Sequence, residues 1–147
     1  MNKTPTSPEG VPDKSTRRTV VTGFALLAVF VPMGLTLEAL HALKVQVYLG
    51  SSMRREMWTL AHAHGGILGV LCLVYGSVAE RWLADASRRE SIATFLRWGA
   101  ILMPCGFFLG GVANHEGDPS LGIVLVPIGG LLLLFALLRA GLAGRDS

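Results

Sequence analysis

Four long apolar runs alternate with short polar segments along this chain. The runs cover residues 20–43, 57–79, 92–113 and 120–139. Each has about the 17–25 residues that a helix needs to cross roughly 30 Å of hydrocarbon. A lone strand cannot satisfy its backbone hydrogen bonds in lipid, so we expect helices. The pattern predicts an all-α, polytopic membrane protein with four transmembrane helices.

The connections between the runs are short, which favours antiparallel packing of consecutive helices in an up-down-up-down bundle. Residues 17–142 then form one four-helix transmembrane domain. Residues 1–16 contain three prolines among polar residues and are predicted to be a disordered cytoplasmic tail. Residues 143–147 form a short cytoplasmic tail at the other terminus. Because 51% of the chain is hydrophobic and 16% is charged, a soluble domain of this length could not cover its apolar surface.

Basic residues are unevenly distributed between the two sides of the predicted bundle. One side holds Lys3, Lys14, Arg17, Arg18, Arg81, Arg88, Arg89, Arg97, Arg139 and Arg145, and the other holds Lys44, Arg54 and Arg55. Cytoplasmic segments of membrane proteins are enriched in Lys and Arg. The asymmetry therefore predicts that both termini are cytoplasmic and that the histidine end faces outward (the periplasm in a Gram-negative bacterium), with the chain in the cell (inner) membrane. It explains the net charge of +3 without a nucleic-acid partner.

Local motifs predict where the helices begin and how closely they pack. A serine of the Gly50-Ser51-Ser52 turn is expected to cap the second span, and Ser87 with Glu90 has the spacing of a capping box for the third. Asp118, followed by a proline, is expected to cap the fourth. The pairs Gly65-x-x-x-Gly69 and Gly106-x-x-x-Gly110 have the small-residue spacing that lets membrane helices approach closely.

All four histidines of the chain fall near the predicted outer end of a span. They are His41, His62, His64 and His115. Glu38 precedes His41 by three residues, so both side chains share one helix face. Ionisable groups at membrane depth are costly and usually functional. This cluster is therefore the candidate functional site.

The spacing of the histidines limits which of them can meet. His62 and His64 are two residues apart, about 200° around a straight helix, so they cannot both point at one centre. His62 shares its face with Gly66 and Gly69 and is predicted to face the bundle interior. His64 is expected to face another helix, a partner or the membrane interface. His115 is a ligand only if its loop folds back over the bundle.

Two kinds of cofactor suit this set of residues. Haem b could be held by His62 with His41 or His115 as the axial ligands, and Arg54 and Arg55 could pair with its propionates. His64 is a further cofactor-binding candidate. A transition metal (Cu, Fe or Zn) could be bound by His41, His62 and His115. Glu38 would then be a fourth ligand or would accept the second N–H of a ligating imidazole.

The leading hypothesis is a small membrane protein that binds haem or a transition metal on its outer side, in electron transfer or small-molecule redox chemistry. If it is an enzyme, it is a membrane oxidoreductase or part of one. The alternative is a cofactor-free accessory or structural subunit, whose His and Glu side chains make interhelical hydrogen bonds. In both cases the bilayer surrounds the chain, and a partner membrane subunit or a second copy of the chain could complete the site.

Overall fold

The described part of the computed structural model consists of residues 13–112, 114 and 117–143, and it contains helices joined by short loops, with no strand. Its elements are α1 (Lys14–Ala42), α2 (Gln46–Leu49), α3 (Ser52–Trp82), α4 (Ala86–Val112), the 3₁₀ turn η1 (Leu121–Val124) and α5 (Leu125–Ala143). α1, α3, α4 and the η1–α5 segment are each long and apolar enough to cross a membrane. The all-helical prediction with four candidate spans is therefore confirmed.

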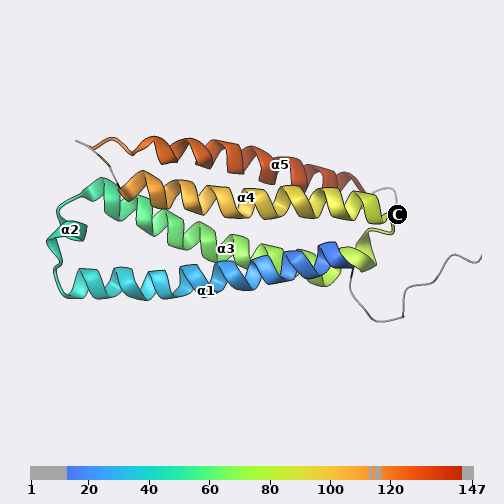
Figure 1. Ribbon diagram of the computed structural model, residues 1–147, viewed down its shortest axis with the longest axis horizontal. Helices are drawn as coiled ribbons and strands as arrows, with labels where there is room; N and C mark the ends of the chain where they lie inside the picture. Colours follow the sequence, from blue (N-terminus) through green and yellow to red (C-terminus); the bar gives the residue numbers. More distant parts are fainter. Residues whose placement is uncertain (1–12, 113, 115–116, 144–147) are drawn as a thin grey trace, which may run out of the picture.

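The long helices lie side by side and alternate in direction (Figure 1). One end of the molecule contains the start of α1, the end of α3, the start of α4 and the end of α5. We call it the basic end, because it holds Lys14, Arg17, Arg18 and Arg97. The opposite end, which we call the histidine end, contains the end of α1, the short α2, the start of α3 and the end of α4. Every predicted site residue that the structure describes lies in the half nearer this end.

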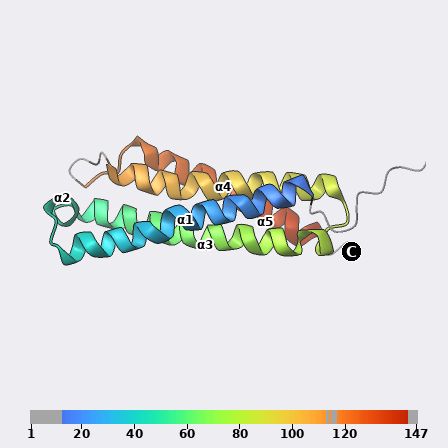
Figure 2. The same cartoon turned by 60° about the horizontal axis from the view of Figure 1, so that its bottom comes forward.

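The four spans do not close into a symmetric bundle. α1 packs along α3 and touches α4, and α3 packs along α4. In the described residues α5 packs along α4 and its backbone does not approach α1 or α3, from which α4 separates it in Figure 1. Figure 2 shows α1 crossing in front of α3 and α4. The architecture is a three-helix core of α1, α3 and α4 with α5 added on the side of α4.

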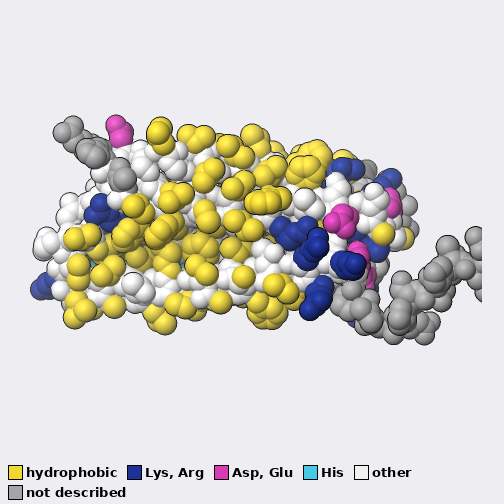
Figure 3. All heavy atoms as spheres, viewed as in Figure 1, with side chains coloured by type: hydrophobic (Ala, Val, Ile, Leu, Met, Phe, Trp, Pro, Cys, Tyr) yellow, Lys and Arg dark blue, Asp and Glu magenta, His cyan; other side chains and the backbone are white. Residues whose placement is uncertain are grey.

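Several of the most buried side chains are small, whereas many large apolar side chains are exposed on the outside. Ala61, Cys72 and Ala100 are fully buried, while Leu131 and Leu35 are 67% and 71% exposed. Apolar side chains cover most of the middle of the visible face in Figure 3. Extensive exposed apolar surface on a chain of this size marks contact with a membrane or a partner. Together with the four apolar helices, it is compatible with a multi-pass membrane protein.

The glycine pairs lie at helix contacts, as their spacing predicts. Gly65 and Gly69 of α3 are buried against α1, and a Cβ at Gly69 would lie 3.1 Å from the carbonyl oxygen of Gly23. Gly106 packs against the first residues of α5, and Gly110 packs against Ile123 of η1. Small residues at these positions let the backbones come together where lipid offers no hydrophobic drive between helices.

The helix ends agree with the motifs only in part. Ser51 caps α3, and its Oγ accepts a hydrogen bond from the backbone N–H of Arg54 at 3.2 Å. The prediction for α4 is wrong, because α4 begins at Ala86 and Asp85 accepts the N–H of Ser87 at 2.9 Å. The prediction for Asp118 is also wrong, because Ser120 is the N-cap residue of η1.

α1 begins at Lys14, within the segment predicted to be a disordered tail. Ser15 and Thr16 are buried on the helix. The rest of that predicted tail, residues 1–12, lies outside the described residues, as do residues 144–147 of the C-terminal tail.

Candidate functional site at the histidine end

His62 lies in the contact between α3 and α1. Its Nδ1 is 2.6 Å from the carbonyl oxygen of Phe30. A carbonyl oxygen can only accept, so Nδ1 carries the proton and donates it, and a neutral ring then keeps its lone pair on Nε2. The imidazole covers Gly34, where an added Cβ would overlap the ring. His62 is half-buried and faces the neighbouring helix, as its position among small residues predicts.

Phe30 makes the reciprocal contact from the other helix. Its side chain is buried and covers Gly65 of α3, where an added Cβ would overlap the phenyl ring. Each helix thus places one aromatic ring over a glycine of the other. We call this set of Phe30, Gly34, His62 and Gly65 the ring–glycine lock. It fixes the separation and register of α1 and α3, because neither glycine accepts a side chain without displacing a ring.

His64 faces a different helix. Its Nδ1 is 2.9 Å from the carbonyl oxygen of Leu60, one turn earlier on α3. Its ring packs against Phe107 of α4 with 4.8 Å between centroids and 35° between planes. The two histidines of α3 therefore contact α1 and α4 respectively, in agreement with their angular separation.

Glu38 and His41 are exposed at the end of α1 rather than buried between helices. His41 lines a shallow groove of about 440 Å³ between α1, α2 and α3. The other residues of this groove are Tyr48, Ser52, Arg55, Glu56, Thr59 and Leu60. Glu56 was not singled out from the sequence, because only the α1–α3 pairing brings it to the same groove as His41.

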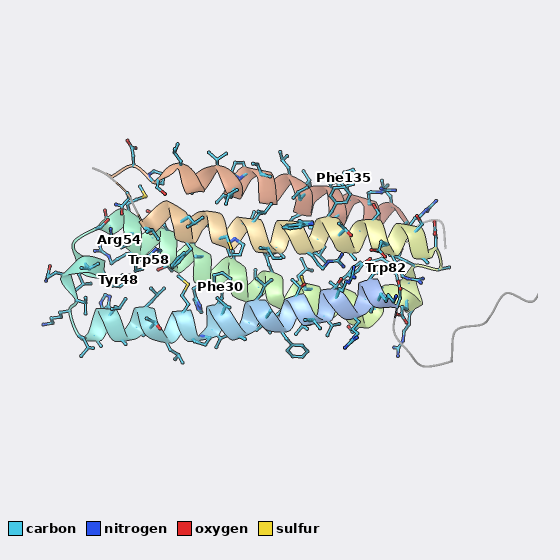
Figure 4. All side chains as sticks on the ribbon, viewed as in Figure 1. Phe30, Tyr48, Arg54, Trp58, Trp82 and Phe135 are labelled. Carbon is cyan, nitrogen blue, oxygen red and sulfur yellow. The ribbon has the colours of Figure 1, made fainter. Side chains whose placement is uncertain are left out.

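Arg54 connects the start of α3 to the end of α4. Its guanidinium donates to the carbonyl oxygen of Gly111 at 3.0 Å, and also to those of Val47 and Val112. It lies 5.7 Å from the centre of the Trp58 ring (Figure 4). A cation at a helix C-terminus satisfies free carbonyls and offsets the helix dipole.

A second set of contacts surrounds Arg54. Asn114 accepts from Arg54 at 3.3 Å and donates to Ser51 at 2.8 Å. The indole N–H of Trp58 donates to the carbonyl oxygen of Phe108 at 3.2 Å, and Tyr48 stacks on Trp58. Arg55 donates to the carbonyl oxygen of Leu49. Arg54 and Arg55, predicted as propionate partners, therefore both bind backbone carbonyls.

The predicted site residues are distributed over separate environments. His62 contacts α1 at Gly34, whereas His41 lies seven residues further along α1, about 10 Å at 1.5 Å per residue. His64 faces the other side of α3. Among the residues that the structure describes, no three His, Cys, Asp or Glu side chains are placed to hold one metal ion. His115, the remaining predicted ligand, lies outside the described residues.

Comparison of the chain with protein-family models, curated proteins and solved structures gives no match.

Proposed function

We propose that this chain is a small multi-pass protein of the cell (inner) membrane that acts as a structural or accessory subunit, with its histidines joining helices rather than holding a cofactor. The observation that carries this proposal is the hydrogen bond of 2.6 Å between Nδ1 of His62 and the carbonyl oxygen of Phe30. It uses a polar side chain of α3 to bind the backbone of α1. His64 supports the proposal through its packing on Phe107.

The depth of His62 explains why such a bond is useful. About 30 Å of hydrocarbon corresponds to about 20 helical residues. If the boundary at the basic end is near Thr19 of α1, where Arg97 binds, the other boundary is near Glu38. The ring of His62 covers Gly34, about one turn inside that boundary. Interhelical hydrogen bonds in a bilayer are worth about 0.6–2 kcal/mol each.

The proposed orientation places both termini in the cytoplasm and the histidine end outside, because the basic residues concentrate at the opposite end. Aromatic residues support the two boundaries. Trp82 lies near the basic end and is half exposed, while Tyr48 and Trp58 lie together at the histidine end (Figure 4). Trp and Tyr concentrate at both interfaces of membrane proteins.

The exposed Glu38 and His41 would be available to a partner. Both are exposed on α1 near the outer boundary. Their polar groups can bind water or a polar side chain of a second membrane subunit or another copy of this chain. This location suits an accessory subunit whose contact with its partner lies at the outer surface.

A second candidate function is the binding of haem b or of a transition metal (Cu, Fe or Zn). One observation favours it: both His62 and His64 bind a backbone carbonyl through Nδ1 and leave Nε2 for another partner. Histidines that ligate metals almost always donate their other ring N–H in this way. In this alternative, His62 and His64 are ligands of two separate cofactor sites, or of sites shared with another chain. His41 and Glu38 would provide ligands for a third site.

The two candidates separate in one experiment. The full-length protein is expressed with haem precursor and metals supplied, purified in a mild detergent, and examined by visible absorption and elemental analysis. We expect no Soret band and well under one Cu, Fe or Zn per chain. A Soret band, or about one metal per chain that His62→Ala removes and His41→Ala retains, would overturn the structural proposal in favour of the second candidate.

A further inference from the structure

The basic end of the molecule contains a groove between the start of α1 and α4, with a volume of about 550 Å³. Four of its lining residues are cationic: Lys14, Arg17, Arg18 and Arg97. The other two are Val21 and Thr22, and none of the described residues that line it is acidic. Lys and Arg side chains gather on this part of the surface in Figure 3. The groove is therefore strongly positive and has one apolar wall.

Arg97 lies half-buried at the α1–α4 contact. Its Nη1 donates to Oγ1 of Thr19 at 3.1 Å and to the carbonyl oxygen of Ser15 at 3.3 Å. Its Nη2 donates to Oγ1 of Thr94 at 3.0 Å. All its hydrogen-bond partners among the described residues are neutral. A partly buried guanidinium without a counter-charge is costly, so an anion in the groove would lower its free energy.

The first turns of α1 add to this positive potential. Lys14, Arg17 and Arg18 lie where the helix dipole is positive, and no acidic residue lies in the first turn itself. Asp13 precedes it as the N-cap residue, and its backbone N–H donates to Glu80. Cations at a helix N-terminus are unfavourable, whereas phosphate and carboxylate groups are favourable there. In the described residues none of the three makes an ion pair. An external anion would neutralise part of this positive charge.

The surroundings of the groove indicate an anion that carries apolar chains. Val21, which lines the groove, is 58% exposed, and Phe24, one turn deeper on α1, is 61% exposed. Trp98, adjacent to Arg97, is 56% exposed on α4. The charged groove thus meets the apolar lateral surface where a lipid headgroup would meet its acyl chains. A free anion would use only the charged part.

We propose that this groove is a binding site for the phosphate of an anionic phospholipid, with Arg97, Arg17 and Arg18 around the headgroup and the acyl chains along Val21 and Phe24. Basic pockets between membrane helices bind lipid headgroups by this combination of charge and depth. The proposal requires insertion of the chain in a membrane, and it is independent of whether the histidines bind a cofactor.

The test titrates the purified full-length protein with phosphatidylglycerol in a neutral detergent and follows lipid retention by native mass spectrometry. Arg17→Gln and Arg18→Gln change exposed side chains, so both variants should fold. Each lost charge near a membrane surface corresponds to about fivefold in affinity. The matched control is Arg81→Gln, which removes an exposed arginine from the same end outside the groove.

We expect saturable binding of phosphatidylglycerol that weakens about fivefold in each groove variant and less than about twofold in the control. Phosphatidylcholine should bind weakly, and inorganic phosphate at equal concentration should not displace phosphatidylglycerol. Equal weakening in Arg17→Gln and Arg81→Gln would show diffuse surface charge and overturn the proposal. Displacement by inorganic phosphate would assign the groove to a free anion, and the absence of saturable binding would refute the site.

Discussion

At the scale of single residues, the contact between α1 and α3 depends on two rings and two glycines. His62 covers Gly34, and Phe30 covers Gly65 from the other helix. The hydrogen bond from His62 to the Phe30 carbonyl joins the two contacts. The His62 imidazole thus both packs against the neighbouring helix and donates a hydrogen bond to it. The exposed His41 side chain, at the end of α1, does neither within the described residues.

This difference predicts unequal effects of the same substitution. His62→Phe keeps a ring over Gly34 and removes the interhelical donor, so the free energy of unfolding should fall by about 0.6–2 kcal/mol. His41→Phe changes an exposed side chain and should alter it by less than about 0.5 kcal/mol. SDS titration in mixed micelles measures both values. A loss in His41→Phe that equals or exceeds the loss in His62→Phe would contradict the assigned roles.

The sequence predicted part of this residue-scale arrangement. The angular offset between His62 and His64 predicted that they face different neighbours, and they do. The shared face of Glu38 and His41 did not reveal that both are exposed, because spacing fixes which residues share a face but not which neighbour that face meets. For the same reason the sequence does not indicate Glu56, because only the pairing of α1 with α3 brings it to the groove that His41 lines.

At the scale of elements, hydropathy predicted the four long helices, because each must satisfy its backbone internally. The ends were harder to predict. Asp85 and Ser87, two positions apart, are both residue types that favour the N-cap of a helix. The same is true of Asp118 and Ser120. Tertiary contacts decide between such neighbours: Ser120 donates its hydroxyl to the carbonyl oxygen of Leu109 and fixes the entry to η1.

Arg54 provides a prediction at this scale, because it binds the last carbonyls of α4 from the start of α3. Arg54→Gln removes the charge and most of these hydrogen bonds, so unfolding should become easier by about 1–3 kcal/mol. Arg81→Gln, the same change at an exposed arginine in the last turn of α3, should cost less than about 1 kcal/mol. Thermal unfolding in detergent compares them. Equal melting temperatures would show that Arg54 does not hold the two helices together.

At the scale of the whole molecule, α4 is the one long helix that α5 contacts within the described residues, and the bundle is open rather than closed. Short connections correctly indicated that consecutive helices are neighbours. They could not indicate whether the last helix returns to the first, because that depends on shape complementarity between faces that are all apolar. Hydropathy predicts which segments lie in the membrane, but it does not predict which of these helices contact one another.

The orientation in the membrane is a further whole-molecule prediction. Asp118 at the histidine end and Ser87 at the basic end are both exposed. A membrane-impermeant maleimide should label Asp118→Cys in intact cells and Ser87→Cys only after the membrane is permeabilised. The unsubstituted chain controls for its two native cysteines, Cys72 and Cys105. The reverse labelling pattern would invert the orientation inferred from the basic residues.

A double-mutant cycle measures whether the His62 ring joins α1 to α3 by packing over Gly34. Gly34→Ala should be destabilising by about 1–3 kcal/mol because its methyl group displaces the imidazole. Gly66→Ala has open space and should cost little. In a His62→Ala background the Gly34→Ala penalty should shrink, giving a coupling free energy of about 0.5–3 kcal/mol in SDS unfolding. Additive effects of the two substitutions would show that His62 and Gly34 do not interact, contrary to the assigned contact.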